Sequence, residues 1–255
     1  MSGPSGFGDL PRPFVFRAAH LDGQVIKPGA AFFFDLILFQ PPESLLPFFT
    51  DTFRELARTG LGPGRGLAQL IAADSLASSS GGLTWNLADG NLDSDRVLLR
   101  FLTPTEIKSA GEITSTLDFH SLFCRLRDRI SSLRACYQGG ALDVDFRAIG
   151  QAAKNVDISW SHLHTVSAER RSSRTGQTHS LGGFAGEIEY TGHLAPFLPY
   201  LKAGEWTGVG RQTVWGKGHY LLEAARVPGT LIKKQVTRGS RLAGYYLDGR
   251  INSQA

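Results

Sequence analysis

Apolar and polar residues are arranged through the second half of the chain in the order strand, helix, strand, strand, helix, strand. The expected elements cover Val97–Thr103, Leu117–Tyr137, Val156–Val166, Ser180–Tyr190, Leu194–Leu201 and Tyr220–Ala225. We expect Pro104 to end the first strand and Gly204 to end the second helix, because each residue interrupts the pattern before it. This order of elements is that of the ferredoxin-like βαββαβ fold.

The first half of the chain repeats the last four elements of that order. A strand is expected at Phe14–Leu21. A central strand, apolar on both faces, is expected at Ala30–Gln40. An amphipathic helix follows, capped by Ser44 and ended by Gly60, and a short strand is expected at Leu67–Ala73. No segment matches the opening strand and helix, so we expect an incomplete first domain.

These elements predict an α+β protein made of tandem ferredoxin-like domains, the first lacking its opening strand and helix. The expected parts are a flexible leader at 1–12, the first domain with a hairpin insertion at 13–94, the second domain with its glycine-rich loop at 95–226, and a carboxy-terminal extension at 227–255. An incomplete first sheet would leave a strand edge that a second copy or a partner chain could pair with.

Composition restricts the class of protein. Of the 255 residues 42% are hydrophobic and 20% are charged, which is typical of globular domains. No apolar run reaches the roughly 20 residues that span a bilayer, and the first residues do not resemble a secretion signal, so we expect a soluble cytoplasmic protein. Cys124 and Cys136 lie on one expected helix, about 18 Å apart, which is too far for a disulfide and unsuited to zinc.

The segment GVGRQTVWGKG, Gly208 to Gly218, is the strongest chemical signal in the chain. Its glycines allow the backbone to turn through positive φ, and its amides and two cations favour a phosphate group. It differs in spacing from nucleotide-binding loops, so no nucleotide cofactor is expected. A surface turn before a strand is the alternative. The residues expected to shape or line an RNA-binding loop are Gly208, Gly210, Arg211, Gly216, Lys217, Gly218 and His219.

Basic and aromatic residues elsewhere extend this signal. The formal charge of +4 favours polyanions, and the segment ERRSSR places Arg171 and Arg174 beside serines that also bind phosphate. A solvated hairpin tip is the alternative for this cluster. Trp206 and Trp215 lie beside and within the glycine loop, where they either stack on unpaired bases or anchor the loop to the core.

The block GGFAGEIEYTGHLAPFLPYLKAGEW, followed by GVGRQTVWGKGHY, resembles the carboxy-terminal domain of the sixth CRISPR-associated protein family. This family belongs to the repeat-associated RNA-binding superfamily, and its members trim the precursor of CRISPR RNA. RRSSR and LRFLTP, and more weakly PFVFR and GLGPGRG, extend the resemblance over most of the chain. The resemblance implies tandem ferredoxin-like domains with a glycine loop between the last helix and the last strand.

The resemblance also implies a reaction and partners. Attack of the ribose 2′-hydroxyl on the adjacent phosphate would give a 2′,3′-cyclic phosphate and a 5′-hydroxyl, with no metal or other cofactor. The expected partner is CRISPR repeat RNA, with association into a CRISPR effector complex or a dimer as further possibilities. Many relatives carry a histidine and a lysine in the glycine loop where this chain has Gly208 and Arg211. The loss of that histidine places any catalytic role of the loop in doubt.

Three histidines are candidates for acid and base catalysis, namely His162, His164 and His20. His162 and His164 lie on one face of an expected strand, and the alternative for them is a solvent-exposed hairpin face. His219 either contacts RNA or packs within its strand. Two other functions remain open: an RNA-binding relative or fragment without catalysis, and a metal-dependent enzyme that uses His162, His164 and His179.

Overall fold

The computed structural model describes residues 10–39, 45–62, 64–73, 95–109, 112–113, 117–137, 139–171, 176, 178–180, 182–224 and 244–248. The chain divides into two compact units. The large unit comprises Met1–Val15 and Trp85–Lys234, and the small unit comprises Phe16–Thr84 and Gln235–Ala255. None of the helices in these described ranges is long and apolar enough to cross a membrane.

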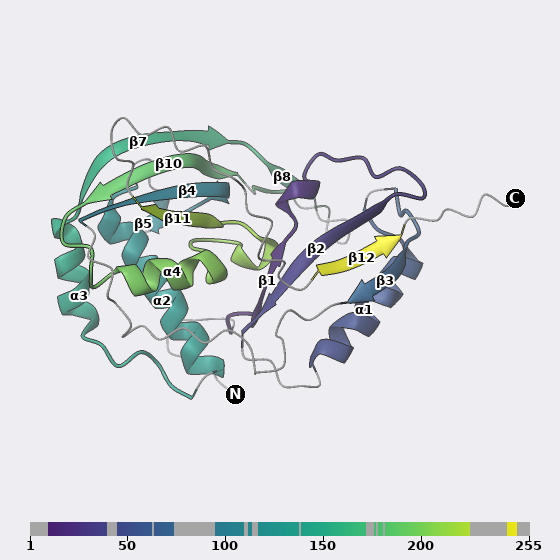
Figure 1. Ribbon diagram of the computed structural model, residues 1–255, viewed down its shortest axis with the longest axis horizontal. Coiled ribbons are helices and arrows are strands. Elements are labelled where there is room, and N and C mark those ends of the chain that lie inside the picture. Colours follow the sequence, from purple (N-terminus) through teal and green to yellow (C-terminus); the bar gives the residue numbers. More distant parts are fainter. Residues whose placement is uncertain are drawn as a thin grey trace, which may run out of the picture. The chain divides into compact units, whose positions relative to one another are not determined.

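The large unit has the βαββαβ order that the sequence predicts (Figure 1). Its main elements are β4 (Arg96–Thr105), α2 (Phe119–Tyr137), β7 (Asp157–Val166), β10 (Gly183–Thr191), α4 (Leu198–Thr207) and β11 (Tyr220–Ala224). The strands pair antiparallel in the order β11-β4-β10-β7, which places the first and third strands in the centre. This is the ferredoxin-like topology, and the prediction is confirmed.

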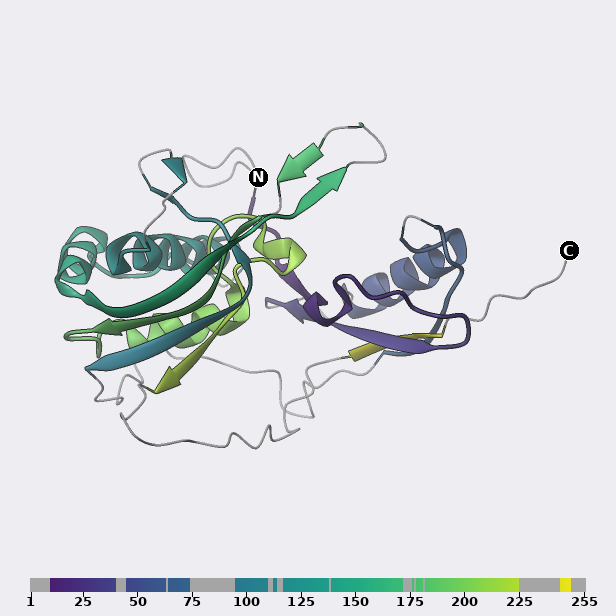
Figure 2. The ribbon, with the colours of Figure 1, turned by 90° about the horizontal axis from the view of Figure 1, so that it is seen from above.

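The large unit also contains shorter strands and helices. They are β5 (Lys108–Ser109), β6 (Glu112–Ile113), α3 (Phe146–Ala152), η2 (Ala153–Asn155), β8 (Glu169–Arg171), β9 (Thr178–Ser180) and η3 (Thr213–Trp215). Asp145 caps α3 by accepting hydrogen bonds from two amides of its first turn. The β8–β9 hairpin extends away from the main sheet beyond β7 and β10 (Figure 2).

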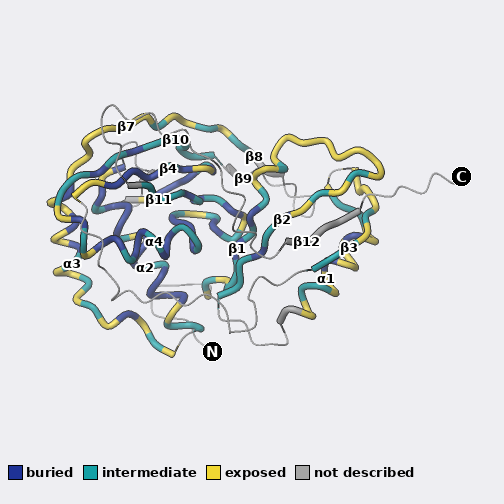
Figure 3. Tube along the Cα trace, in the orientation of Figure 1, coloured by how far each residue is buried: buried dark blue, intermediate teal, exposed yellow. Residues whose placement is uncertain are grey.

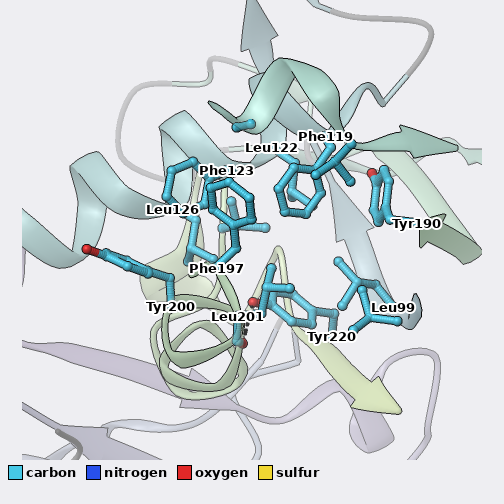
Figure 4. Packing of buried hydrophobic residues seen from close by; sticks show 14 of the residues in the cluster. Leu99, Phe119, Leu122, Phe123, Leu126, Tyr190, Phe197, Tyr200, Leu201 and Tyr220 are labelled. Carbon is cyan, nitrogen blue, oxygen red and sulfur yellow. Dashed lines mark hydrogen bonds between the residues drawn. The ribbon is translucent and has the colours of Figure 1, made fainter. Parts of the chain in front are cut away.

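Buried residues follow α2, α4 and the sheet (Figure 3). Their aromatic and aliphatic side chains form one continuous core (Figure 4). Phe197 packs edge-on against Phe119 and Phe123, with ring centroids 5.1 and 4.7 Å apart. Two buried tyrosines keep their hydroxyls satisfied: Tyr190 donates to Leu117 O at 2.8 Å and Tyr220 donates to Leu201 O at 2.7 Å. The core therefore fixes both helices and the strand that follows the glycine loop.

Two of the predicted ends are wrong. The first strand of this unit continues through Pro104 to Thr105, where the chain meets the glycine loop. Helix α4 continues past Gly204 to Thr207, and Gly208 follows it at φ 67°. Gly204 is needed for packing instead, because a Cβ there would lie 2.0 Å from the Tyr220 hydroxyl oxygen.

The small unit is a four-stranded sheet with one described helix. Its sheet includes β1 (Phe14–Arg17), which crosses the boundary between the units at Val15. Its other elements are η1 (Ala19–Leu21), β2 (Ala31–Leu38), α1 (Leu45–Thr59), β3 (Gln69–Ala73) and β12 (Gly244–Asp248). The strand predicted to reach Leu21 ends at Arg17 and is followed by the 3₁₀ turn η1. Phe34 and Phe53 pack edge-on at 5.1 Å, which joins β2 to α1.

The strand order of the small unit is β1-β2-β12-β3. Strand β12 pairs antiparallel with both β2 and β3 (Figure 1). In the large unit the corresponding position, between β10 and β11, belongs to the opening strand β4. The place of the opening strand that the sequence lacks near its start is therefore taken by a strand from the carboxy-terminal segment.

Candidate nucleic-acid interface

The glycine loop is tied to the end of β4 by hydrogen bonds. Gly218 N donates to Pro104 O at 3.2 Å, and Thr103 Oγ1 donates to Gly216 O at 2.9 Å. Thr103 Oγ1 also accepts a bond from His219 N at 2.9 Å. Within the loop, Val209 N donates to Gly218 O at 3.0 Å, which closes its base. The loop is therefore a folded part of the large unit.

Most of the loop amides that could hold a phosphate are already used. The amides of Gly208, Val209, Arg211, Trp215, Gly216 and Gly218 all donate to backbone carbonyls. Phosphate-binding loops instead leave several successive amides for the anion. The expectation that these amides are exposed donors for RNA is thus wrong at these six positions.

The glycines serve close packing of the backbone. A Cβ on Gly218, at φ 71°, would lie 1.9 Å from Val209 O, and one on Gly210, at φ 85°, would lie 2.4 Å from Glu106 O. Gly208 and Gly216 also have positive φ. These glycines shape the loop as expected. They do so by letting its first and last residues approach one another and the end of β4.

Arg211 has an acidic partner that the sequence analysis missed. Its guanidinium forms an ion pair with Glu106, whose side chain is 8% exposed while that of Arg211 is 51% exposed. The amide of Arg211 also donates to Glu106 O at 2.9 Å. The Arg211 guanidinium therefore already has a carboxylate partner within the large unit. Glu106 is distant in sequence and follows a strand, so no local pattern marks it as the partner.

Lys217 and Trp215 are the loop side chains best placed to meet a ligand. Lys217 is partly exposed, and its ammonium group has no hydrogen-bond or ion-pair partner within the described part of the chain. Trp215 is 55% exposed, so its ring presents a stacking surface. Trp206 and His219 are partly buried, which fits the anchoring and packing alternatives for these two residues.

Arg129, which the sequence analysis also missed, holds the residue that precedes the glycine loop. Arg129 of α2 donates from Nε to Thr207 O at 2.9 Å, at the end of α4. Burial lowers the pKa of its guanidinium to about 10, and the group remains charged at neutral pH. A cation at a helix carboxy-terminus is favourable, so Arg129 holds the point where α4 turns into the loop.

The arginine cluster is described only in its backbone. Arg171 lies at the end of β8, where it pairs with Thr178 of β9. The side chain of Arg171 and the whole of Arg174 lie outside the described residues, as does the side chain of His179. Their predicted roles stay predictions.

His162 and His164 lie on β7, an edge strand, and both are exposed. The ring of His162 stacks on Trp160 at 6.1 Å, and Glu187 lies opposite it on β10. Glu187 is also paired with Arg100, at 2.7 Å. Within the described ranges, no group of three or more His, Cys, Asp or Glu side chains is placed to hold a metal ion.

His20 lies in the small unit, in η1, and is exposed. Its Nε2 lies 2.8 Å from Phe33 O, and its ring stacks on Phe33 at 4.4 Å. The contacts described for His20 thus lie within the small unit.

Comparison with known protein families gives a match for the large unit. Residues 99–220 match the family described as CRISPR-associated endoribonuclease Cas6. This region begins within β4, ends at the first residue of β11 and includes the complete glycine loop. Over these residues the large unit is similar to the Cas6 family.

Structural comparison agrees on the fold. A Cas6 product complex (TTHB231) aligns with a TM-score of 0.55 and 20% identity, over 84% of this chain and 83% of that one. A second Cas6 product complex (TTHA0078) gives 0.50 and 17%, over 84% and 85%. Another structure, of Thermus thermophilus Cas6 (TTHB231), aligns over 51% of this chain and 54% of its own, at 19% identity and a TM-score of 0.40. The two product complexes, at TM-scores of 0.55 and 0.50, thus share the tandem ferredoxin-like fold of this chain.

Two further comparisons complete the picture. Residues 3–95 match a family described as an N-terminal domain. No curated protein matches the chain. The Cas6 assignment thus rests on the large unit, and the family is one of endoribonucleases.

Proposed function

We propose that this protein binds CRISPR repeat RNA and cleaves the precursor of CRISPR RNA without a metal ion. The ribose 2′-hydroxyl would attack the adjacent phosphate, leaving a 2′,3′-cyclic phosphate and a 5′-hydroxyl. The similarity of residues 99–220 to the Cas6 family is the observation that carries this proposal. The partners proposed with it are the repeat RNA and, after cleavage, a CRISPR effector complex or a second copy.

The loop surface supports RNA binding through side chains. Lys217 and Arg211 supply positive charge and Trp215 supplies an exposed ring, all on a loop whose backbone is held by its own hydrogen bonds. A surface that is already ordered loses little conformational entropy on binding. We assign the loop to RNA binding, and with Gly208 where relatives carry histidine we place proton transfer elsewhere.

Cleavage of a labelled repeat RNA tests the proposal. The RNA should be cut at one position in EDTA, and a 2′-deoxy substitution at that position should abolish the cut, because the nucleophile is then absent. Tight binding without cleavage would favour the non-catalytic relative. Cleavage that needs added metal would refute the proposed chemistry.

A matched pair of loop variants tests the RNA surface. Lys217→Ala should weaken binding and lower the dependence of affinity on salt, because one phosphate contact is lost. Lys202→Ala, which removes a lysine from α4 outside the loop, is the control for the change in net charge. Equal effects of the two variants would contradict the assignment of the loop.

A further inference from the structure

Strand β7 is the outer strand of the large-unit sheet, and one of its edges is open (Figure 1). Among the described strands it pairs only with β10, so every second residue turns its amide and carbonyl away from the sheet. In the described part of the chain, no backbone hydrogen bond outside the sheet involves residues 157–166. All of its ten residues except Leu163 and Val166 are exposed. The outer backbone groups of β7 are therefore accessible.

The sequence of β7 lacks the features that usually protect a strand edge. Protected edges are short, carry lysine or proline, or are covered by another segment. The strand DISWSHLHTV contains neither lysine nor proline, and apart from its histidines its only ionisable residue is Asp157, at its start. One bulge leaves Ser159 without an opposite residue, and residues 160–166 then pair continuously with β10. Residues 160–166 thus form a regular edge that another strand can join.

The other edge of the same sheet is protected. Strand β11 has only five residues. The amide of Leu222 donates to the Glu205 carboxylate of α4 at 2.7 Å, so it is not available to a further strand. The large unit thus covers a hydrogen-bonding position on its β11 edge with a side chain and leaves the longer β7 edge accessible.

The surface beside β7 favours a protein strand over RNA. Glu187 and Glu189 lie on β10, next to β7. They pair with Arg100 at 2.7 Å and Arg96 at 3.4 Å, so these cations are already neutralised. Carboxylates repel phosphate groups, whereas an added strand binds mainly through backbone hydrogen bonds. The occupant that fits an edge with so little charge is an extended polypeptide.

A second copy of the chain supplies a strand that matches this edge. A two-fold axis at Leu163 pairs residues 160–166 of one copy antiparallel with the same residues of the other, so the whole regular segment is used. Leu163 packs against the core, so Ser161 and Thr165 share its face of the strand. Ser161 then lies opposite Thr165 of the second copy, which is a favoured cross-strand pair.

The opposite face of the strand is also self-complementary in this pairing. Trp160, which is 45% exposed, lies opposite Val166 of the second copy, and aromatic residues pair favourably with β-branched ones. His162 lies opposite His164 of the second copy, so two rings meet on each side of the axis. With neutral imidazoles, no like charges oppose each other anywhere in residues 160–166.

We propose that two copies of this chain pair through β7 in a two-fold dimer centred on Leu163, which joins their two large-unit sheets into one. The same surface serves on both copies, so the assembly closes as a dimer and leaves no accessible edge at β7. This inference goes beyond the RNA function proposed above and does not depend on it.

Sedimentation equilibrium of the full chain without RNA tests the dimer. At pH 8, where imidazole is neutral, a reversible dimer is expected between about 1 and 100 µM, because the interface is small. The double variant His162→Lys/His164→Lys places lysine opposite lysine and should weaken dimerisation by about tenfold or more. The double variant His162→Lys/His164→Glu uses the same positions but places each lysine opposite a glutamate, so it should dimerise as the wild type does. Gln24→Lys/His193→Lys, at two exposed positions outside β7, is the control for added charge.

Cysteine cross-linking tests the register. In Leu163→Cys the new thiol lies opposite its copy, with Cα atoms about 4.5–5.5 Å apart, which suits a disulfide. In Thr165→Cys the copy lies about 13 Å further along the strand, so no link should form. Wild type, which keeps Cys124 and Cys136, gives the background on a non-reducing gel.

A wild-type protein that stays monomeric at the highest concentration would overturn the dimer. Equal dissociation constants for the two β7 double variants would also overturn it, as would failure of Leu163→Cys to link. If the lysine variant loses its circular dichroism spectrum, the two cysteine variants decide. Cleavage of repeat RNA is measured separately, so a monomer that cleaves removes this inference alone, and a dimer that does not cleave removes only the proposed function.

Discussion

Asp35 should destabilise the folded small unit above pH 6, and Asp35→Asn should relieve that cost. Burial favours the neutral carboxyl group, so the folded state holds the proton more tightly than the unfolded chain does. The resulting stability is fully present below pH 3.8 and is lost as the pH rises through about 6. Asparagine keeps the shape of the side chain without an ionisable group.

The size of the effect follows from the pKa. A rise from 3.8 to about 6 corresponds to about 3 kcal/mol at 1.36 kcal/mol per pH unit. Asp35 is only partly buried, and solvent screening reduces the effect, so we expect a gain of about 1–2 kcal/mol at pH 8. At pH 3 the gain should fall close to zero, because below 3.8 the carboxyl group is mostly protonated in both the folded and the unfolded state.

Hydrogen exchange of the β2 amides is the appropriate assay. The four tryptophans belong to the large unit, so tryptophan fluorescence does not report on the small unit. Wild type and Asp35→Asn are compared at each pH, with Asp22→Asn as the exposed control. A gain of equal size at both pH values, or slower exchange in the wild type at pH 8, would refute the argument.

Three further changes test the loop and the small-unit sheet. Glu106→Gln should strengthen RNA binding by about two- to fivefold in a filter-binding assay, because Arg211 loses the carboxylate that it shares with phosphate. Gly218→Ala should cost the large unit about 2 kcal/mol or more in urea unfolding followed by tryptophan fluorescence, from positive φ and from the close carbonyl. Tyr246→Pro should speed hydrogen exchange of β2 and β3, because β12 pairs on both sides and proline removes a donor.

Controls separate these effects from simpler ones. Glu55→Gln on α1 changes the net charge as Glu106→Gln does, and equal affinities would contradict the role of Arg211. Gly139 also has positive φ but has no atom within 4 Å of an added Cβ, so Gly139→Ala measures the backbone term alone. Tyr246→Pro should leave the exchange of β10 unchanged, and a loss of protection in both units would contradict a local role of β12.

Local patterns predicted most of the large unit, because each of its elements is encoded by nearby residues. Apolar periodicity marked its six elements, and the βαββαβ order then determined the topology. Two ends of these strands and helices were predicted wrongly, because where an element ends depends on contacts with distant parts of the fold. Gly204 interrupts no helix here, since its missing side chain makes room for the Tyr220 hydroxyl.

Pairings between distant segments could not be predicted from periodicity. Strand β12 follows β3 by more than 160 residues, and no short-range signal links its residues to the gap between β2 and β3. The Glu106–Arg211 pair spans 105 positions, and Asp35 acquires its altered pKa from burial and from charges on other elements. The chemistry of the candidate sites thus depends on contacts that only the fold creates.

The amides of the glycine loop have a different role from the one that the sequence pattern indicates. The pattern indicated a turn whose exposed amides and two cations face a phosphate, but six of those amides donate to carbonyls of the protein. Because the loop is ordered by its own hydrogen bonds, we propose that it offers side chains, not backbone amides, to RNA. Its affinity should therefore follow the charge of Lys217 and Arg211 and the ring of Trp215, whereas the glycines act through the stability of the large unit.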